Sequence, residues 1–243
     1  MGKTLGKVSA SRTRLLETSA RKVSRLSGHR MESTRREGKY CFLQAGGEEW
    51  LVLHFGMTGS VSLYDNRGKP PEYTVLSMEL KEGGAHLAIL SKRKLGKIDV
   101  TGSPDEFLEE NEIGRDALKC SEKEFVEILG SKRGSIKSAL MNQSSLSGIG
   151  NIYGDEILFQ ARVHPQKRID RLQEKDLKDL YQTVQEVLDT AIESEADPGK
   201  MPESYLIRHR GKDEKCPSCN GPVKKIKVSG RAGYYCPECQ KKE

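Results

Sequence analysis

Short runs of hydrophobic residues alternate with polar turns through the first hundred residues of the chain. The runs are rich in valine, leucine and aromatic side chains, and glycines punctuate them. They predict β-strands at residues 39–44, 50–55, 61–64, 73–80 and 86–90. This spacing favours a meandering antiparallel sandwich or a flattened barrel. We also expect an edge strand at 5–10 and a short helix at 19–26.

Beyond residue 100 the hydrophobic positions recur at three- and four-residue steps, which is typical of helices. Ser103 and Ser121 each precede a glutamate by three residues, and this spacing is a helix-start signal. Residues 135–141 and 151–161 predict two further helices, and Ile152 is expected to face inward.

The clearest helical pattern runs from residue 175 to residue 192. Its hydrophobic residues, which we expect in a core, are Leu177, Leu180, Tyr181, Val184, Val187, Leu188, Ala191 and Ile192. The predicted fold class is therefore α+β. We divide the chain into a β domain at 1–100, a helical domain at 101–196, and a linker with a small C-terminal module at 197–243.

The composition is that of a polar-surfaced protein, with 35% hydrophobic and 31% charged residues. No apolar run reaches the length of a membrane span, and the N-terminus has no apolar signal region. We therefore expect no membrane partner. We also expect a reducing, cytoplasmic compartment, in which cysteines stay as thiols or bind metal.

Two Cys-x-x-Cys pairs lie near the C-terminus, and sixteen residues separate them. This spacing predicts one zinc ion bound by Cys216, Cys219, Cys236 and Cys239. Two disulfides are the alternative, which the absence of a signal region and two further lone cysteines disfavour. Four protein ligands close the coordination shell, so the zinc is expected to be structural.

The C-terminal module carries the positive charge of the protein. Residues 207–243 contain ten Lys or Arg residues and four acids, an excess equal to the net charge of +6 for the whole chain. A basic hairpin that a metal ion holds together is suited to binding the phosphate backbone of a nucleic acid. A solubilising tail is the alternative, but such a tail would not need four metal ligands.

A glycine turn at residues 148–150 opens a helix at Asn151. The backbone amides of a helix N-terminus and a side-chain amide can together bind one phosphate. An ordinary corner between two helices is the alternative.

The loop 91–96 combines the cations Arg93 and Lys94 with the apolar Leu95. This combination is typical of a wedge that contacts phosphates and enters a gap between stacked bases. A solvated turn is the alternative. Met57 lies in a second glycine-flanked turn, where buried packing is the commoner role of a methionine.

These segments together resemble the formamidopyrimidine-DNA glycosylase and endonuclease VIII family of base-excision repair. The motifs that carry the resemblance are Gly38-Lys39-Tyr40, His54-Phe55-Gly56-Met57-Thr58-Gly59-Ser60, Arg93-Lys94-Leu95-Gly96, Ser135-Ile136-Lys137, Gly148-Ile149-Gly150-Asn151 and Arg231-Ala232-Gly233-Tyr234-Tyr235-Cys236. Their order is that of the family, and the match extends from about residue 2 to the end.

The resemblance implies an N-terminal β-sandwich, a helix–two-turn–helix domain and a zinc finger, with kinked duplex DNA between them and a damaged base flipped out. It implies phosphate contacts by Lys39, His54, Lys94, Asn151 and Arg231. It implies that the space left by the flipped base is filled by Met57, Arg93 and Leu95. The preferred lesion is left open, because Lys94 and Leu95 replace the arginine and the frequent phenylalanine of the family.

The family uses an N-terminal Pro-Glu-Leu-Pro-Glu segment, whose proline amine attacks the sugar. This sequence begins Met1-Gly2-Lys3, which resembles a family segment some twenty residues further in. We therefore assign no catalytic residue. Either the true start lies upstream, or the chain is a truncated DNA binder. We favour an upstream start, because loss of the first helix would expose hydrophobic positions of the β domain.

The preferred interpretation is a DNA glycosylase and AP lyase family protein that is catalytically impaired in this form. It would bind kinked, damaged or abasic double-stranded DNA as a monomer associated with the nucleoid. A non-catalytic damaged-DNA-binding protein is the first alternative. A zinc-ribbon nucleic-acid-binding factor is the second, and it would leave Lys39, Met57 and Asn151 unexplained.

Overall fold

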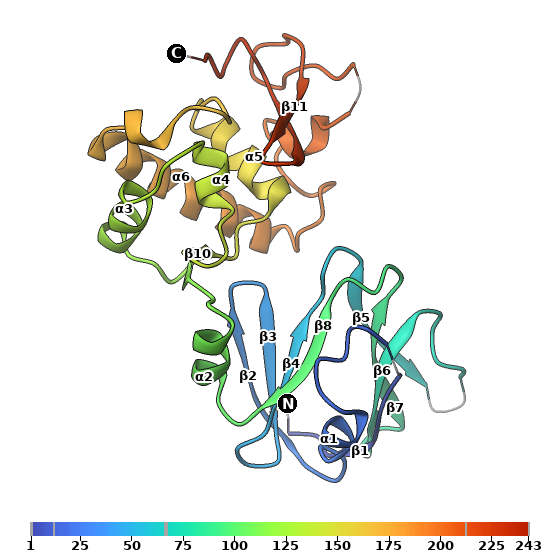
Figure 1. Cartoon of the computed structure of the whole chain (residues 1–243). Helices are drawn as coiled ribbons and strands as arrows, with labels where there is room; N and C mark the ends of the chain where they lie inside the picture. The colour runs from blue at the N-terminus through green and yellow to red at the C-terminus, as the bar shows by residue number, and fades with distance from the viewer. Residues whose placement is uncertain (1, 12, 66–67, 212, 243) are drawn as a thin grey trace. The chain divides into compact units, whose positions relative to one another are not determined.

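The computed structural model describes residues 2–11, 13–65, 68–211 and 213–242 (Figure 1). Lys212 and Glu243, which contribute to the charge of the C-terminal module, lie outside these ranges. The chain divides into two compact units, Met1–Glu112 and Ile113–Glu243. Among the described helices, none is long and apolar enough to cross a membrane.

The first unit contains two antiparallel sheets of four strands each. One sheet has the order β1-β6-β7-β5 and consists of β1 (Leu5–Ala10), β6 (Thr74–Leu80), β7 (Ala85–Ser91) and β5 (Gly59–Asp65). The other has the order β2-β3-β4-β8 and consists of β2 (Met31–Glu37), β3 (Tyr40–Ala45), β4 (Trp50–His54) and β8 (Lys97–Thr101). The unit also contains the short helices α1 (Ala20–Ser24) and α2 (Pro104–Glu110).

Residues of both sheets share one hydrophobic core. Leu5 and Met78 from the first sheet pack in the same cluster as Leu51 and Val100 from the second. The sandwich predicted from the sequence is therefore confirmed, and β1 is an edge strand as expected. Strands β2 and β8 were not predicted. In β2 only Met31 is buried, because this strand also lies at a sheet edge and carries mostly polar residues.

The second unit is helical, with a C-terminal hairpin. Its helices are α3 (Glu122–Gly130), α4 (Ile136–Leu140), α5 (Asn151–Gln160), α6 (Glu174–Glu193) and the 3₁₀ turns η1 (Ile169–Arg171) and η2 (Leu206–His209). Its strands are the short parallel pair β9 (Arg115–Asp116) and β10 (Leu146–Ser147) and the hairpin β11 (Lys224–Val228) and β12 (Arg231–Tyr235).

The predicted helix starts are confirmed. The hydroxyl of Ser103 accepts a hydrogen bond from the Glu106 amide, and Ser121 forms a complete capping box with Glu124. Ser135 caps α4 in the same way. These caps satisfy amides that have no partner within the helix, so they fix where each helix begins.

Two predicted core positions are wrong. Ile152 is 46% exposed and Ile192 is 60% exposed, whereas Leu180 and Val184 are buried as expected. Ile152 lies in the first turn of α5, and Ile192 lies in the last turn of α6. The periodicity of hydrophobic residues predicts which face of a helix is buried. It does not predict how far along the helix neighbouring elements cover that face, so residues in the terminal turns can be exposed.

Candidate nucleic-acid interface

The four cysteines of the two Cys-x-x-Cys pairs converge. Their Sγ atoms all lie within 4.8 Å of one another, with 3.7 Å between Cys216 and Cys239 and 3.5 Å between Cys219 and Cys236. Tetrahedral zinc with Zn–S bonds of ~2.3 Å requires Sγ atoms ~3.8 Å apart, so the cluster fits the metal. The amide of Gly221 also points at the Cys219 Sγ, which suits a thiolate. The chain thus has one structural zinc site.

A two-residue turn joins the two strands of the hairpin, which lies between the two cysteine pairs. Val228 pairs with Arg231, and the turn residues Ser229 and Gly230 have φ values of +48° and +79°. Two positive φ values are the signature of a type I′ turn, which matches the twist of the strands. Arg231 is therefore the first residue after the tip, and its side chain is exposed.

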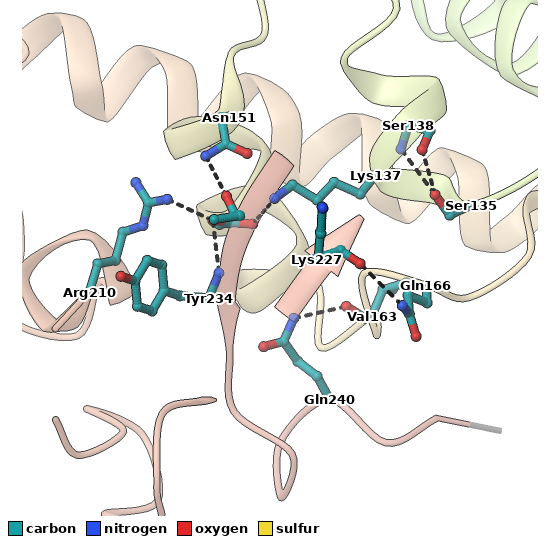
Figure 2. Close-up of polar contacts among 12 residues, drawn as sticks. Ser135, Lys137, Ser138, Asn151, Val163, Gln166, Arg210, Lys227, Tyr234 and Gln240 are labelled. Atoms are coloured by element: carbon teal, nitrogen blue, oxygen red, sulfur yellow. Dashed lines mark hydrogen bonds and ion pairs between the residues drawn. The ribbon is translucent and has the colours of Figure 1, made fainter. Parts of the chain in front are cut away.

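A buried carboxylate joins this hairpin to the helices. Asp155 on α5 is fully buried, and its Oδ1 lies 2.6 Å from the Nζ of Lys137 on α4, which is 1% exposed. Its Oδ2 accepts hydrogen bonds from the Nη2 of Arg210 at 2.8 Å and from the backbone amide of Tyr234 at 3.0 Å. In Figure 2 the dashed lines from Lys137, Arg210 and Tyr234 meet at one side chain. Burial raises the pKa of the Asp155 carboxyl, and the Lys137 ammonium opposes the rise.

Close approach of the hairpin requires a glycine at position 233. A Cβ added there would overlap the Lys137 ammonium and would lie 2.7 Å from the Asp155 Oδ1. The strand can therefore reach the carboxylate only because residue 233 has no side chain.

The neighbouring Glu156 anchors a different segment. It is also buried, and it accepts hydrogen bonds from the amides of Leu206 and Ile207 at 3.0 and 2.6 Å. Burial raises the pKa of the Glu156 carboxyl, and the bond from Gln160 opposes the rise. Asp155 and Glu156 are therefore structural acids. Both are enclosed by the protein, so neither is placed to exchange protons with a sugar or a base.

Asn151 begins α5 beside the hairpin tip. Its Nδ2 donates a hydrogen bond of 2.8 Å to the carbonyl of Ala232, the residue next to Arg231 (Figure 2). Its Oδ1 is buried and has no hydrogen-bond partner among the described residues. Gly150 provides no side-chain cap, so the first amides of the ten-residue helix are not capped by a side chain.

A hollow of about 460 Å³ lies between α4 and the hairpin tip. Its lining includes Lys137, Ser138, Asn142, Ser229 and Arg231. The hydroxyls of Ser138 and Ser229 share a hydrogen bond, which ties the hairpin turn to α4. Polar and apolar side chains both line the hollow, and the exposed Arg231 gives it a cation that can contact a phosphate group.

In the first unit, two turns of the chain form a single projection. We call residues 55–58 and 92–96 the two-turn tip. Met57 and Leu95 are 73% and 42% exposed, and the Nη1 of Arg93 lies 3.6 Å from the Met57 Sδ. The Arg93 amide donates to the Thr58 Oγ1 at 3.2 Å. The three residues assigned to filling the base gap are therefore neighbours in space. The exposure of Met57 differs from the buried role that is common for methionine.

Glycine allows the two turns to approach each other. Gly56 has a φ of +63°, and a Cβ there would lie 2.7 Å from the Leu95 carbonyl oxygen. A Cβ at Gly96 would overlap the carbonyl of His54. The two backbones are in direct contact, so a side chain at either glycine would separate them.

His54 ends β4 next to this tip. Its Nδ1 accepts a hydrogen bond from the Gly56 amide at 3.1 Å, so in the neutral ring the proton lies on Nε2. Burial lowers the pKa of His54, and the charges of Lys39 and Lys97 lower it further. Lys39 is exposed in the turn between β2 and β3. Tyr40 pairs with His54, so Lys39, which precedes Tyr40, lies at the same end of the sheet as His54.

Three residues that organise these surfaces have no role predicted from the sequence. Arg14 contacts the two-turn tip through the carbonyls of residues 93 and 94. Lys137 and Asp155 form the buried ion pair. Lys137 has a detectable signal, because it is the one charge within the otherwise uncharged helix α4. Arg14 has none, because it lies in an exposed segment outside the regular elements.

Three family models cover almost the whole chain. They are the formamidopyrimidine-DNA glycosylase N-terminal domain at residues 1–98, the formamidopyrimidine-DNA glycosylase H2TH domain at 113–201, and a zinc finger found in FPG and IleRS at 213–242. The matches follow one another in the order in which the strands, helices and cysteine cluster occur.

Relatives named formamidopyrimidine-DNA glycosylase match over most of the chain. The Solibacter usitatus protein is 31% identical over 90% of this chain and 84% of its own length. The Arabidopsis thaliana protein is 30% identical over 88% of this chain, which spans only 59% of that relative. Among solved structures, a complex between the Lactococcus lactis Fpg and abasic-site DNA matches with a TM-score of 0.85 at 29% identity, over 99% of this chain and 93% of that one.

The sandwich, the helix–two-turn–helix segment and the four-cysteine cluster thus agree with sequence relatives and solved structures. The chain belongs to the formamidopyrimidine-DNA glycosylase family.

Proposed function

We propose that this chain binds duplex DNA at a damaged or abasic position, as a monomer associated with chromosomal DNA. The observation that carries the proposal is the two-turn tip, in which Met57 and Leu95 are exposed and the Arg93 guanidinium contacts the Met57 sulfur. Exposed apolar side chains beside a cation suit insertion between bases that have lost a stacking partner. An intact stack offers no such gap, so the tip favours DNA with a missing or flipped base.

Phosphate contacts are the second part of the proposal. In the first unit, Lys94 belongs to the tip, and His54 ends β4 next to it at the same end of the sheet as Lys39. The Nε2 proton of His54 is suited to a phosphate oxygen. In the second unit, Asn151 donates a hydrogen bond to the carbonyl of Ala232, and the preceding residue, Arg231, lines the hollow. The Lactococcus lactis relative was solved with abasic-site DNA, which supports the same ligand class here.

Binding to labelled duplexes tests the proposal. Fluorescence anisotropy would compare an intact duplex with one that contains a tetrahydrofuran abasic analogue, over a series of salt concentrations. We expect tighter binding to the abasic duplex and a linear fall of log K with log salt. Equal affinity for the two duplexes would contradict the proposal and favour a general zinc-ribbon nucleic-acid binder.

Variants of the second unit test the phosphate roles. Asn151→Ala and Arg231→Ala should weaken binding to all sequences equally, and Arg231→Ala should reduce the salt slope by about 1. Lys175→Ala is the matched control, because the exposed ammonium of this lysine on α6 has no hydrogen-bond or ion-pair partner among the described residues. A sequence-dependent loss of affinity would argue against phosphate contacts.

Borohydride treatment of the same complexes distinguishes a lyase from a binder. A covalent protein–DNA adduct would identify a Schiff base and hence lyase chemistry. Binding without an adduct would identify a damage-binding protein. Sedimentation of the free protein tests the monomer, and a dimer would contradict that part of the proposal.

A further inference from the structure

Arg14 contacts the two-turn tip from a segment far away in sequence. Its Nε donates to the carbonyl oxygen of Lys94 at 2.8 Å, and its Nη2 donates to the carbonyl oxygen of Arg93 at 3.0 Å. We propose that Arg14 is the positioning residue that holds Met57, Arg93 and Leu95 in the geometry needed to enter a base gap. This inference rests on the proposed function of the tip.

The bonded carbonyls lie on both sides of a strained backbone position. Lys94 has a φ of +50°, in the left-handed region that residues with a side chain rarely adopt. Such a conformation persists only when surrounding contacts hold it. The Arg14 guanidinium supplies two of these contacts, one to the carbonyl before Lys94 and one to the carbonyl of Lys94 itself.

This backbone position sets the direction of the residues that project from the tip. Arg93 precedes Lys94 and Leu95 follows it, so a change of φ at Lys94 alters the direction of one side chain relative to the other. Arg93 in turn contacts Thr58 and Met57 in the other turn. By fixing residues 93 and 94 in the second turn, Arg14 therefore also positions Met57 and Thr58 in the first turn.

Arg14 is itself firmly anchored. The next residue, Leu15, is buried, and its carbonyl accepts a hydrogen bond from the Ile98 amide at 2.7 Å. The carbonyl of Ile98 then accepts from the Glu17 amide at 3.0 Å, which pins the segment to β8. The guanidinium thus connects a segment held to β8 with the two-turn tip. A lysine cannot replace it, because a single ammonium does not present two donors in a fixed fork.

The test uses a duplex that carries 2-aminopurine opposite a tetrahydrofuran abasic site. Fluorescence of 2-aminopurine rises when the base is unstacked, so it reports insertion of the tip rather than binding alone. The variants are Arg14→Gln and Arg14→Lys. The control is Arg21→Gln on α1, which removes the same charge from an exposed arginine whose guanidinium has no hydrogen-bond or ion-pair partner among the described residues.

We expect both Arg14 variants to lose the fluorescence rise and to lose about tenfold of the preference for abasic over intact duplex, since a shift of ~1 Å in a positioned group costs up to ~10²-fold. Arg21→Gln should retain both. Amide hydrogen exchange without DNA should be faster at residues 92–96 in the Arg14 variants only. Trp50, in the core sheet of the first unit, reports whether the unit is folded.

Wild-type fluorescence and preference in Arg14→Gln would overturn the inference, as would an equal loss in Arg21→Gln. If the wild-type protein has no preference for the abasic duplex, the proposed function fails. The exchange rates still decide whether Arg14 holds the tip, and unchanged rates would overturn that claim independently. If Arg14→Gln does not fold, Arg14→Lys carries the same comparison with the charge retained.

Discussion

The Nζ of Lys137 lies 2.6 Å from the Oδ1 of Asp155, and both side chains are removed from solvent. One belongs to α4 and the other to α5, and the second oxygen of the same carboxylate binds Arg210 and the Tyr234 amide of the hairpin. A single ionised group thus connects two helices, the linker and the zinc finger. The attraction between the carboxylate and its cationic partners compensates for the free energy that it costs to remove these charges from water.

Loss of one partner should be costly. Lys137→Met leaves the carboxylate under-compensated, and we expect the second unit to lose about 3–5 kcal/mol of unfolding free energy. Lys178→Met is the control, because its ion pair with Glu174 is exposed to solvent and contributes little to stability. Urea unfolding followed by circular dichroism at helical wavelengths measures both, since the only tryptophan lies in the first unit. Equal costs for the two variants would contradict the structural role of the buried pair.

The glycine beside this carboxylate should not tolerate a methyl group. Gly233→Ala places a Cβ against the Lys137 ammonium, and overpacking of this kind costs about 1–3 kcal/mol. Gly102→Ala is the matched control, because a Cβ there meets no atom within 4 Å. Thermal unfolding of the two variants is the measurement. A neutral Gly233→Ala would show that the hairpin does not need its close approach to α5.

Removal of one zinc ligand should unfold the finger alone. Cys219→Ser is expected to release the metal and weaken DNA binding, while Trp50 fluorescence reports an intact β unit. Cys41→Ser is the control, because Cys41 lies in β3 of the first unit, away from the cluster. Metal analysis of the purified proteins decides the matter, and zinc retained by Cys219→Ser would mean that the ligand set is wrong.

Acid should destabilise the first unit through His54. Because the pKa of His54 is lowered in the folded state, the unfolded chain binds the proton more readily once the pH falls below about 6.5. Stability is therefore full above the unfolded pKa and is lost as the pH falls through the lower folded value. His54→Gln should lose less stability between pH 7.5 and 5, as measured by urea unfolding followed at Trp50. An identical pH dependence in both proteins would contradict this assignment.

Structural features that depend on residues close together in the sequence could be predicted without a structure. The serine caps of α2, α3 and α4 act over three residues, and the cysteine pairs identify themselves by spacing. The β-sandwich followed from runs such as Trp50–His54, in which three central residues are buried. Such signals are local, because each pattern records the environment of its own segment.

Features that depend on distant partners could not be read in this way. Arg14 meets the carbonyls of residues 93 and 94 across about eighty positions, and Asp155 meets the Tyr234 amide across 79. Asp155 also looks like a surface charge in a helix, and only its partners make its burial possible. The two-turn tip was anticipated as a wedge from its composition, but its junction with Met57 depends on close backbone contact at Gly56.

The adjacent anchors Asp155 and Glu156 have a consequence for synthesis of the protein on the ribosome. Lys137 and both acids emerge early, whereas Leu206, Arg210 and Tyr234 are still to be translated. A nascent helical unit therefore keeps two hydrated carboxylates on α5 until the last forty residues appear. Capture of zinc, docking of the finger and dehydration of both acids then form one late event. A ribosome that stops before residue 206 releases a helical unit in which Asp155 and Glu156 lack these partners.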